Sequence, residues 1–479
     1  MSTSNASRSN LFELSTDIVL TDSAGKTYDL TGEKANVQVL ALKVYESLEL
    51  PYLQAELSIA DSGVNLIGRI PIYGMEKVTF GVKTPYFSDT EYKYEFRVAA
   101  VKDRSGLSKL QTYTLDLISF EGLQNEGLRV GKMYADYGHN IVSNVMKDYF
   151  KTTKKVNTDD PCKYKMKMIP RNQRPFELIY SILSKCVPSS ANPAADTATS
   201  SFSLPSTSNS SGQSDANPTS KLSGSAGYFF WETYDGFNFS SIDKLCDPGK
   251  SKDTFSYKLA KTDSNTDPGR SILEYQYLSE IDVLKKLRHG TYNSMMVFFN
   301  PSTGNYEEYT YDINTSYPAM KHLGKDEKIP DGPKQLAKYP TRIMTQFLDS
   351  ETFYNGTDIA SPDSQDNPGG GGSSYPDYKK YYMAQSIGRK LLLKNQEMHI
   401  TINGNLTLRA GDRINILLPN FSSESVKDKE QQYDKQHSGV YLIKDITYEF
   451  YLQKNNQNNI AVTNMTLIRD SFGSFTLEV

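Results

Sequence analysis

The first hundred residues alternate apolar and polar positions in several short runs. One run covers residues 53–59 and another residues 92–98. This period of two is typical of strands with one buried and one wet face. Turn-forming residues at 61–63 and 103–106 separate the runs. A small antiparallel barrel or sandwich is therefore predicted for this part of the chain.

Beyond residue 121 the period becomes helical at 139–150 and at 175–187, where Pro175 suits a first helical turn. Further helices are predicted near 281–288 and 378–394. The run 227–237 is predicted to form a tight hairpin with Asp235-Gly236 at its tip. A second hairpin is predicted from 292–299 and 306–312, and the residues from 398 onward return to strands.

These patterns predict a fold that is mainly β with an α minority (α+β), built from two similar antiparallel β-barrel domains and a helical, mixed connecting domain. Ser, Thr, Asn and Pro dominate one segment that cannot bury enough apolar surface to order itself, and four consecutive glycines mark another. The predicted units are a first barrel domain (1–120), a mixed α/β connecting domain (121–187), a Ser-rich flexible insert (188–226), hairpins and a short helix that continue the connecting and second barrel domains (227–360), a Gly-rich linker (361–376), and the helix and main strands of the second barrel domain (377–479).

The composition excludes some classes of function. The chain has 479 residues with 33 Tyr and 21 Phe beside a single Trp, which favours several β-rich units. Its formal charge of -3, from 53 basic and 56 acidic residues, lacks the basic excess that gripping a nucleic acid requires. The sequence shows no secretory leader and no run approaching about 18 apolar residues, so no membrane insertion is expected.

The candidate chemistry is sparse, and no catalytic residue, metal site or cofactor is expected. The three cysteines, Cys162, Cys186 and Cys246, are far apart and are expected to be reduced and structural. Glu307 and Glu308 are adjacent on a predicted strand, so they point to opposite faces and cannot converge on one sugar bond. The histidines show no metal-ligand spacing; they are His139, His289, His322, His399 and His437.

Two parts of the chain repeat an order of features. A glycine turn, an acidic-basic pair and an alternating strand are followed by a second strand (92–101; 440–452) and a third (112–118; 462–468). Short strands share composition anywhere, so chance and true duplication both remain open. If the duplication is real, a trimer would present a pseudo-sixfold surface. The residues predicted to form these elements are Gly74, Glu76, Lys77, Val78 and Phe80 in the first copy and Gly411, Asp412, Arg413, Ile414 and Ile416 in the second.

Many short segments, in order and spread over most of the chain, form a pattern. They are 44–53, 60–61, 71–78, 117–121, 174–176, 229–239, 241–243, 290–294, 408–414, 438–443 and 467–471. Together they resemble the baseplate central hub proteins of contractile-tailed, T-even-like phages, a tube-domain family related to type VI secretion spike hubs. No single segment is diagnostic, and the Ser-rich insert and the Gly-rich linker depart from the family.

The resemblance implies a structural protein and not an enzyme. It implies a homotrimer whose pseudo-hexameric ring adapts a threefold spike to a sixfold tail tube and lines the channel for the tape measure protein and for DNA, which is present only in transit during genome ejection. The implied partners are the spike protein, with or without a lysozyme domain of its own, the tail tube or tube-initiator protein, the tape measure protein and the baseplate wedge proteins. The implied location is the tail baseplate of the virion, after assembly in the host cytoplasm.

Two alternatives remain open at this stage. A hub of a type VI secretion or other contractile injection particle would share these domains, although such spikes usually continue into a fused β-helix that this sequence lacks. A receptor-binding or glycan-binding tail protein would use exposed tyrosines and Trp231 as sugar platforms. Against that alternative, Trp231 is expected to pack within its hairpin.

Overall fold

A computed structural model gives the structure of the chain. It describes residues 13–31, 37–62, 66–69, 72–107, 110–194, 196–199, 222–247, 251–257, 267–279, 282–299, 304, 306–324, 338–347, 379–420, 433–452 and 459–472. The predicted Gly-rich linker and the centre of the Ser-rich insert lie outside these residues. No helix among the described residues is both long and apolar enough to cross a membrane.

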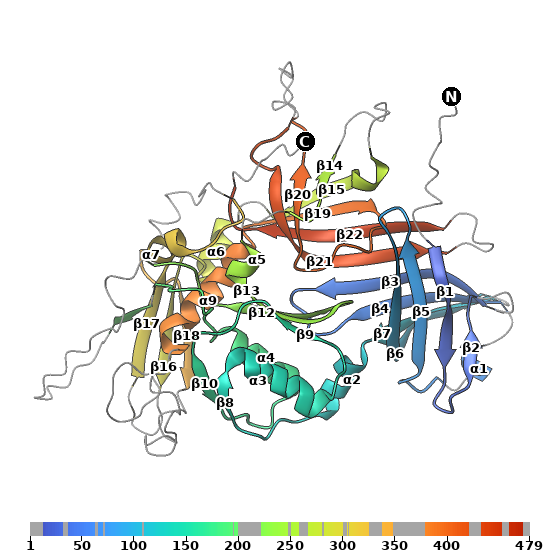
Figure 1. Cartoon of the computed structure of the whole chain (residues 1–479), viewed down its shortest axis with the longest axis horizontal. Helices are drawn as coiled ribbons and strands as arrows, with labels where there is room; N and C mark the ends of the chain where they lie inside the picture. The colour runs from blue at the N-terminus through green and yellow to red at the C-terminus, as the bar shows by residue number, and fades with distance from the viewer. Residues whose placement is uncertain are drawn as a thin grey trace, which may run out of the picture.

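One 13-stranded sheet contains two groups of strands, here called the first and second half-sheets (Figure 1). The first half-sheet has the order β3-β4-β7-β6-β5-β1, with β2 beside β1. The second has the order β15-β19-β22-β21-β20-β14. The bounds in the first are β1 Glu13–Thr21, β2 Thr27–Asp29, β3 Val37–Ser47, β4 Gln54–Asp61, β5 Lys77–Thr84, β6 Ser88–Leu107 and β7 Leu110–Ile118, with helix α1 at Leu66–Arg69. Those in the second are β14 Thr254–Ser256, β15 Ile272–Ser279, β19 Gln396–Asn403, β20 Arg413–Leu417, β21 Gly439–Tyr451 and β22 Ile460–Arg469, with a 3-10 turn at Pro268–Arg270.

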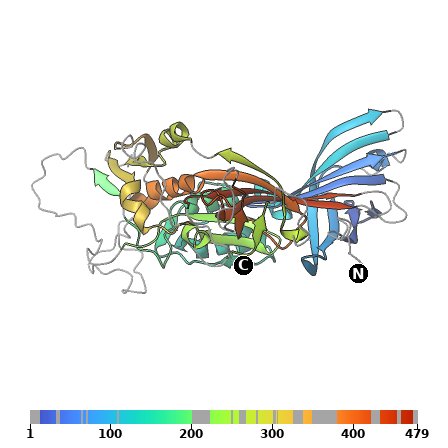
Figure 2. The ribbon, with the colours of Figure 1, turned by 90° about the horizontal axis from the view of Figure 1, so that it is seen from above.

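The strands of the sheet follow the predicted alternation. In β4 the side chains of Ala55, Leu57 and Ile59 are buried in the core, and the polar residues between them are partly exposed. The sequence therefore predicted strand content correctly in this region, because each strand buries one face only. Seen from above, the first half-sheet curls strongly at its end of the molecule (Figure 2).

The two half-sheets are joined because β21 changes partner along its length. Gly439–Leu442 pair antiparallel with β20, and Asp445–Tyr451 pair antiparallel with β3. One hydrophobic core extends under both halves. The prediction of two separate closed barrels is wrong for the described strands: they form one sheet path, and the link from β14 to the start of β15 is a single isolated bridge between Ser256 and Ser271.

A unit of helices and short strands, here called the connecting unit, lies below the sheet in Figure 1 and has its own hydrophobic core. The predicted helices near residues 139 and 175 are confirmed there, and Pro175 begins the second of them. Its elements are α2 Phe120–Gly127, β8 Tyr134–Tyr137, α3 Gly138–Val145 with a π-helical turn Met146–Phe150, β9 Val156–Thr158, β10 Lys165–Met168, α4 Pro175–Leu183, β12 Tyr228–Thr233, β13 Gly236–Ser241 and α5 Ile242–Leu245.

The β12–β13 hairpin is the part of the connecting unit that packs against the main sheet. Every residue of β12 is buried. Phe229 and Trp231 belong to the core of the main sheet, whereas Phe230 belongs to the core of the connecting unit. The hairpin was predicted correctly, but its tip is wrong by one residue: Thr233 pairs with Gly236, so the two turn residues are Tyr234 and Asp235.

A third unit, here called the side unit, is a four-stranded sheet covered by helix α9. The second predicted hairpin and the helices predicted near residues 281 and 378 are confirmed here. Both ends of the Ser-rich segment are ordered here: β11 pairs with β17, and Asn192 forms a bridge with Ser223. The elements are β11 Thr197–Thr199, α6 Val283–His289, β16 Asn293–Phe299, β17 Tyr306–Asp312, α7 Ile313–Ser316 with a 3-10 turn Tyr317–Ala319, β18 Arg342–Phe347 and α9 Lys379–Leu393.

Candidate functional site

The repeat seen in the sequence is present in the hydrogen bonds of the two half-sheets. In the first, Met75 N–H donates to Val98 O at 2.8 Å and Val98 N–H donates to Glu76 O at 2.9 Å. In the second, the N–H of Gly411 donates to Ile443 O, and that of Ile443 to Asp412 O, both at 2.9 Å. The structural counterpart of Gly411 is therefore Met75, one residue after the glycine that the sequence aligned with it.

A β-bulge follows the turn-bonded residue, Val98 or Ile443, in both half-sheets. The register between β6 and β7 shifts between Val98 and Ala100, and the register between β21 and β22 shifts between Ile443 and Asp445. A bulge adds one unpaired residue and is a specific feature of a strand pair. The outermost strands differ, since β1 is antiparallel to β5 and β14 is parallel to β20. The five other strands share one order, one bulge position and one pattern of turn bonds, which favours true duplication over shared composition.

The predicted strand residues take equivalent places in the two halves. Val78 and Phe80 in β5, like Ile414 and Ile416 in β20, are buried in the common core. The acidic residue of each pair holds its turn. Glu76 accepts hydrogen bonds from Tyr73 N–H at 2.7 Å and Gly74 N–H at 3.0 Å, and Asp412 accepts one from Arg409 N–H at 2.7 Å. Lys77 forms an ion pair with Glu95 at 2.7 Å. Their role in forming a tube stays a prediction.

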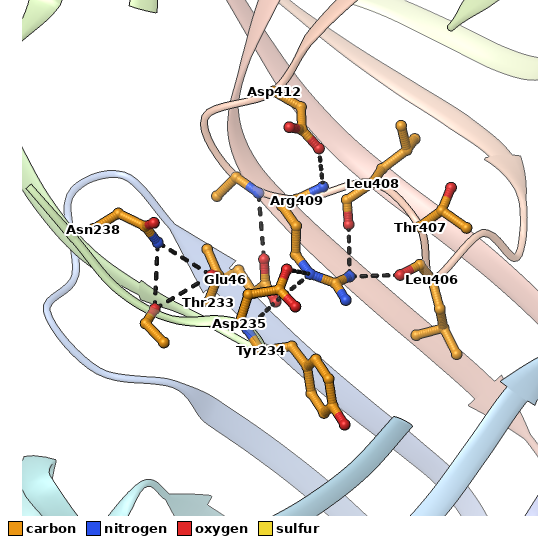
Figure 3. Close-up of polar contacts among 12 residues, drawn as sticks. Glu46, Thr233, Tyr234, Asp235, Asn238, Leu406, Thr407, Leu408, Arg409 and Asp412 are labelled. Carbon is orange, nitrogen blue, oxygen red and sulfur yellow. Dashed lines mark hydrogen bonds and ion pairs between the residues drawn. The ribbon is translucent and has the colours of Figure 1, made fainter. Parts of the chain in front are cut away.

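The turn of the second half-sheet is covered by an ion cluster in which Glu46 and Arg409 are buried and Asp235 is exposed (Figure 3). Arg409 comes from this turn; its Nε lies 3.2 Å from Asp235 at the hairpin tip and 3.9 Å from Glu46 at the end of β3. Glu46 accepts hydrogen bonds from the N–H groups of Tyr234 and Ala410. Burial raises the pKa of Glu46 to about 7, and the nearby Arg409 opposes that rise.

Sequence reasoning missed this cluster, although Glu46 and Arg409 both lie in segments that carried the family resemblance. The available signal was weak, because these two residues are separated by most of the chain. The cluster joins the end of β3, the hairpin tip and the turn before β20, and it therefore fixes the place where the two half-sheets meet.

Trp231 seals the same turn. Its Nε1–H donates to Ala410 O at 3.0 Å, and its side chain is only 4% exposed. The glycan-binding alternative therefore loses Trp231 as a sugar platform, as the sequence analysis expected. Gly411 has a φ of 94°, and a Cβ on it would lie 2.7 Å from the Trp231 ring.

Gly411→Ala is expected to lower the free energy of unfolding by about 2–3 kcal/mol, because strain at positive φ adds to a clash with a packed ring. Chemical denaturation measures the loss. Gly25→Ala is the matched control, since Gly25 has a φ of 83° with nothing within 4 Å of its missing Cβ. Equal losses in the two variants would show that the Trp231 contact contributes nothing.

Two stretches of the main sheet that correspond to the joined edges of β21 and β3 have no partner strand on one side among the described residues. On β6, pairing with β5 ends at Arg97 and Val98 still bonds to Met75 and Glu76, so the stretch 99–107 has β7 on one side only. At one end of the sheet path, β15 pairs with β19 alone. Both stretches carry exposed apolar side chains, of which Val101 is 38% exposed and Leu278 52% exposed. Open edges of this kind are templates for pairing with another chain.

The equivalent turns differ sharply in burial. Arg409 in the second half-sheet is 7% exposed, whereas Tyr73 in the same position of the first is 86% exposed. Met75, the counterpart of Gly411, is 55% exposed. The turn of the first half-sheet therefore has no cover from the described residues comparable to that of the second.

The described residues contain no group of three or more His, Cys, Asp or Glu side chains placed to hold a metal ion. The histidines with described contacts bind protein atoms: His139 accepts the N–H of Cys162, and His322 and His437 contact Asp470 and Asp434. The carboxylate of Glu307 accepts the hydroxyl of Tyr309 at 2.7 Å, a contact within its own strand.

No protein-family model and no curated protein matches the chain. Solved structures do resemble it. A tail protein from Neisseria meningitidis MC58 has a TM-score of 0.47 and 9% identity and covers 96% of this chain and 98% of its own. The 43 kDa tail protein of prophage MuSo2 from Shewanella oneidensis has a TM-score of 0.46 and 11% identity, with 95% and 99% covered.

A component of the Escherichia coli type VI secretion system, described as structurally similar to the phage T4 tail proteins gp27 and gp5, has a TM-score of 0.39 and 8% identity, with 93% of this chain and 78% of its own covered. The structural neighbours are thus tail proteins and type VI secretion proteins, the classes to which the sequence resemblance pointed. Because each TM-score is below 0.5, this likeness alone does not assign the chain to a family.

Proposed function

We propose that the protein is a structural baseplate hub subunit of a contractile phage tail, and that its copies join by their sheet edges into a ring. The observation that carries this proposal is the duplication. Within one chain, two similar half-sheets already meet edge to edge where β21 pairs with β3. The corresponding edges, on β6 and β15, lie open toward other copies.

A contact between two different edges is heterologous, and such contacts form closed rings when the rotation between copies closes. Three copies with two half-sheets each would place six similar half-sheets around one axis. Such a ring offers threefold symmetry to a spike and nearly sixfold symmetry to a tail tube or tube-initiator protein. Symmetry matching is then the function, and no catalytic step is required.

The channel of this ring would pass the tape measure protein and then DNA, and wedge proteins would contact its outer face. The net charge of -3 agrees with a conduit, because an excess of lysine and arginine would bind phosphates and slow passage. The unpaired backbone of the two stretches agrees with assembly, since an open strand edge is a template for pairing with another chain.

Mass in solution tests the proposal. Light scattering of the purified protein, alone and mixed with the spike protein of the same genome, is expected to give three times the chain mass of 53.8 kDa, plus the spike where it binds. The expected particle resists salt, because the proposed contact between strands is carried mainly by backbone hydrogen bonds. A chain that stays monomeric with the spike and binds glycans instead would overturn the proposal in favour of a receptor-binding role.

A further inference from the structure

We infer the register of the contact between copies: β6 of one copy pairs antiparallel with β15 of the next so that Ser105 lies opposite Gln276, and the turn at Tyr73 and Met75 packs against the start of α6 of that next copy. This inference rests on the proposed ring. It deepens the proposal by naming the contacting surfaces, for which the joint inside the chain is the template.

The template is the β21–β3 ladder. It runs from the pair Asp445 and Ser47 to the pair Tyr451 and Ala41. In its middle Glu449 lies opposite Lys43, and their side chains form an ion pair at 3.2 Å. Directly opposed residues on one face are the pairs that stabilise a sheet.

The duplication maps this ladder onto the open edges. The pairing of β6 with β7 and of β21 with β22 gives a common reference. Ser105 lies opposite Thr112 of β7, and Glu449 lies opposite Val462 of β22. Thr112 and Val462 are the first residues of the aligned segments 112–118 and 462–468. Ser105 is therefore the counterpart of Glu449.

The same reasoning applies to the other edge. Lys43 lies opposite Glu56 in β4, and Gln276 lies opposite His399 in β19. Glu56 and His399 are equivalent, because they face Asp116 and Thr466, which occupy the same place in the two aligned segments. Gln276 is therefore the counterpart of Lys43, and both it and Ser105 are exposed.

A further detail supports this register. Relative to β21, β6 contains one extra residue between Lys102 and Ser105. Relative to β3, β15 contains one extra residue between Tyr277 and Ser279. In the inferred register these two irregularities face one another, so the ladder continues on both sides of them. A shift by one residue would place each strand's side chains on the wrong face of its partner.

The turn contact follows from what covers the second turn. Directly after β3, Leu48 N–H donates to Lys444 O at 2.9 Å, and Leu48 Cδ2 lies 3.5 Å from the place of a Cβ on Gly411. The element that follows β15 in the chain is α6, and none of its described residues is buried. Leu284 in α6 is 59% exposed, and Tyr73 and Met75 are exposed in the turn that α6 of the next copy would approach.

A cysteine pair tests the register in the full-length protein. Ser105→Cys with Gln276→Cys is expected to give disulfide-linked oligomers up to a trimer on a non-reducing gel after mild oxidation with diamide. Directly opposed residues have Cα atoms roughly 4.5–5.5 Å apart, which a disulfide spans. The native cysteines Cys162, Cys186 and Cys246 are buried, and the unsubstituted chain controls for them.

The matched control is Ser105→Cys with Glu274→Cys, since a diagonal pair is about 7–8 Å apart and beyond the reach of a disulfide without backbone movement. The register is refuted, and the ring is not, if the protein is a trimer by mass and the control pair links as well as the test pair. The same conclusion follows if the protein is a trimer and neither pair links. A persistent monomer would refute the ring and the register together.

The turn contact has a separate test. Tyr73→Ser and Leu284→Ser are each expected to raise the concentration at which trimers dissociate by about tenfold, because each removes an apolar contact at the interface. Tyr339→Ser is the control, with Tyr339 75% exposed on another part of the chain. Sedimentation measures the protein concentration at which half of the trimers dissociate. If neither test variant changes this concentration, the turn does not touch the next copy.

Discussion

Arg409→Met is expected to lower the free energy of unfolding by about 3–5 kcal/mol near pH 8, measured by chemical denaturation. The substitution leaves the carboxylate of Glu46 buried without its cation, and unpaired buried charges of this kind carry losses of that size. It also removes the donor that Arg409 provides to Leu406 O, Leu408 O and the Tyr448 hydroxyl. Both half-sheets and the hairpin are expected to loosen together, because the cluster joins all three.

The loss should depend on pH. The pKa of Glu46 in the folded chain is about 7, above the ordinary value of 4.5, so the folded state binds more protons than the unfolded state between those values. The contribution of Glu46 to stability therefore falls as pH rises from about 4.5 to 7. Without Arg409 that pKa rises further, so the cost of Arg409→Met should grow from pH 5 to pH 8.

Glu46→Gln is the companion variant, because it removes the charge and keeps the shape of the side chain. Its cost is expected to be smaller than that of Arg409→Met at pH 8, and the double variant should recover part of the loss of Arg409→Met. A cost of Arg409→Met that is the same at pH 5 and pH 8 would contradict a charge-based role for the pair.

Asp470→Asn is expected to lower the free energy of unfolding by about 3–5 kcal/mol at neutral pH, again because a buried cation loses its partner. Asp470 lies just after β22, and its carboxylate contacts Arg389 of α9 at 2.5 Å and His322 at 2.8 Å. The side chains of Asp470 and Arg389 are fully buried. This pair therefore fixes the side unit to the second half-sheet.

Burial by itself would raise the pKa of Asp470, but Arg389 and His322 outweigh it and hold the pKa well below its ordinary value of 3.8. Stability from this group is complete above the unfolded value and is lost as pH falls toward the folded pKa. The cost of Asp470→Asn should therefore shrink as pH is lowered below about 4.

Asp247→Asn is the matched control for Asp470→Asn. Asp247 pairs with Lys321 at 3.6 Å on the surface, with 36% of its side chain exposed. Surface pairs contribute only about 0–1 kcal/mol. Thermal unfolding should separate the two variants clearly, and a similar small shift in both would show that the Arg389–Asp470 pair is not needed for docking the side unit.

The predictions from local pattern succeeded where the residues of one short segment are enough to predict its secondary structure. The alternation in residues 53–59 became β4, the helical spacing after Pro175 became α4, and the helix predicted near residue 378 became α9. Burial of one face explains each success, since the period of two or of 3.6 follows from which side chains must reach a core. The hairpin tip shifted by one residue because Gly236, with a φ of 118°, begins β13.

The sequence by itself determined the strands, the helices and the ordered repeat, because each of these depends on residues that are near one another in the chain. Tertiary structure alone decided that β3 pairs with β21, that Arg409 meets Glu46, and which edges stay open. Those contacts join residues hundreds of positions apart, and a strand's own pattern does not say which edge it will pair with. Barrels were predicted because alternation indicates that a strand has one buried face. Closure of a barrel depends instead on whether the first and last strands of a sheet pair with each other. Here part of the β21 edge pairs with β3 of the other half-sheet, and the two half-sheets form one sheet path.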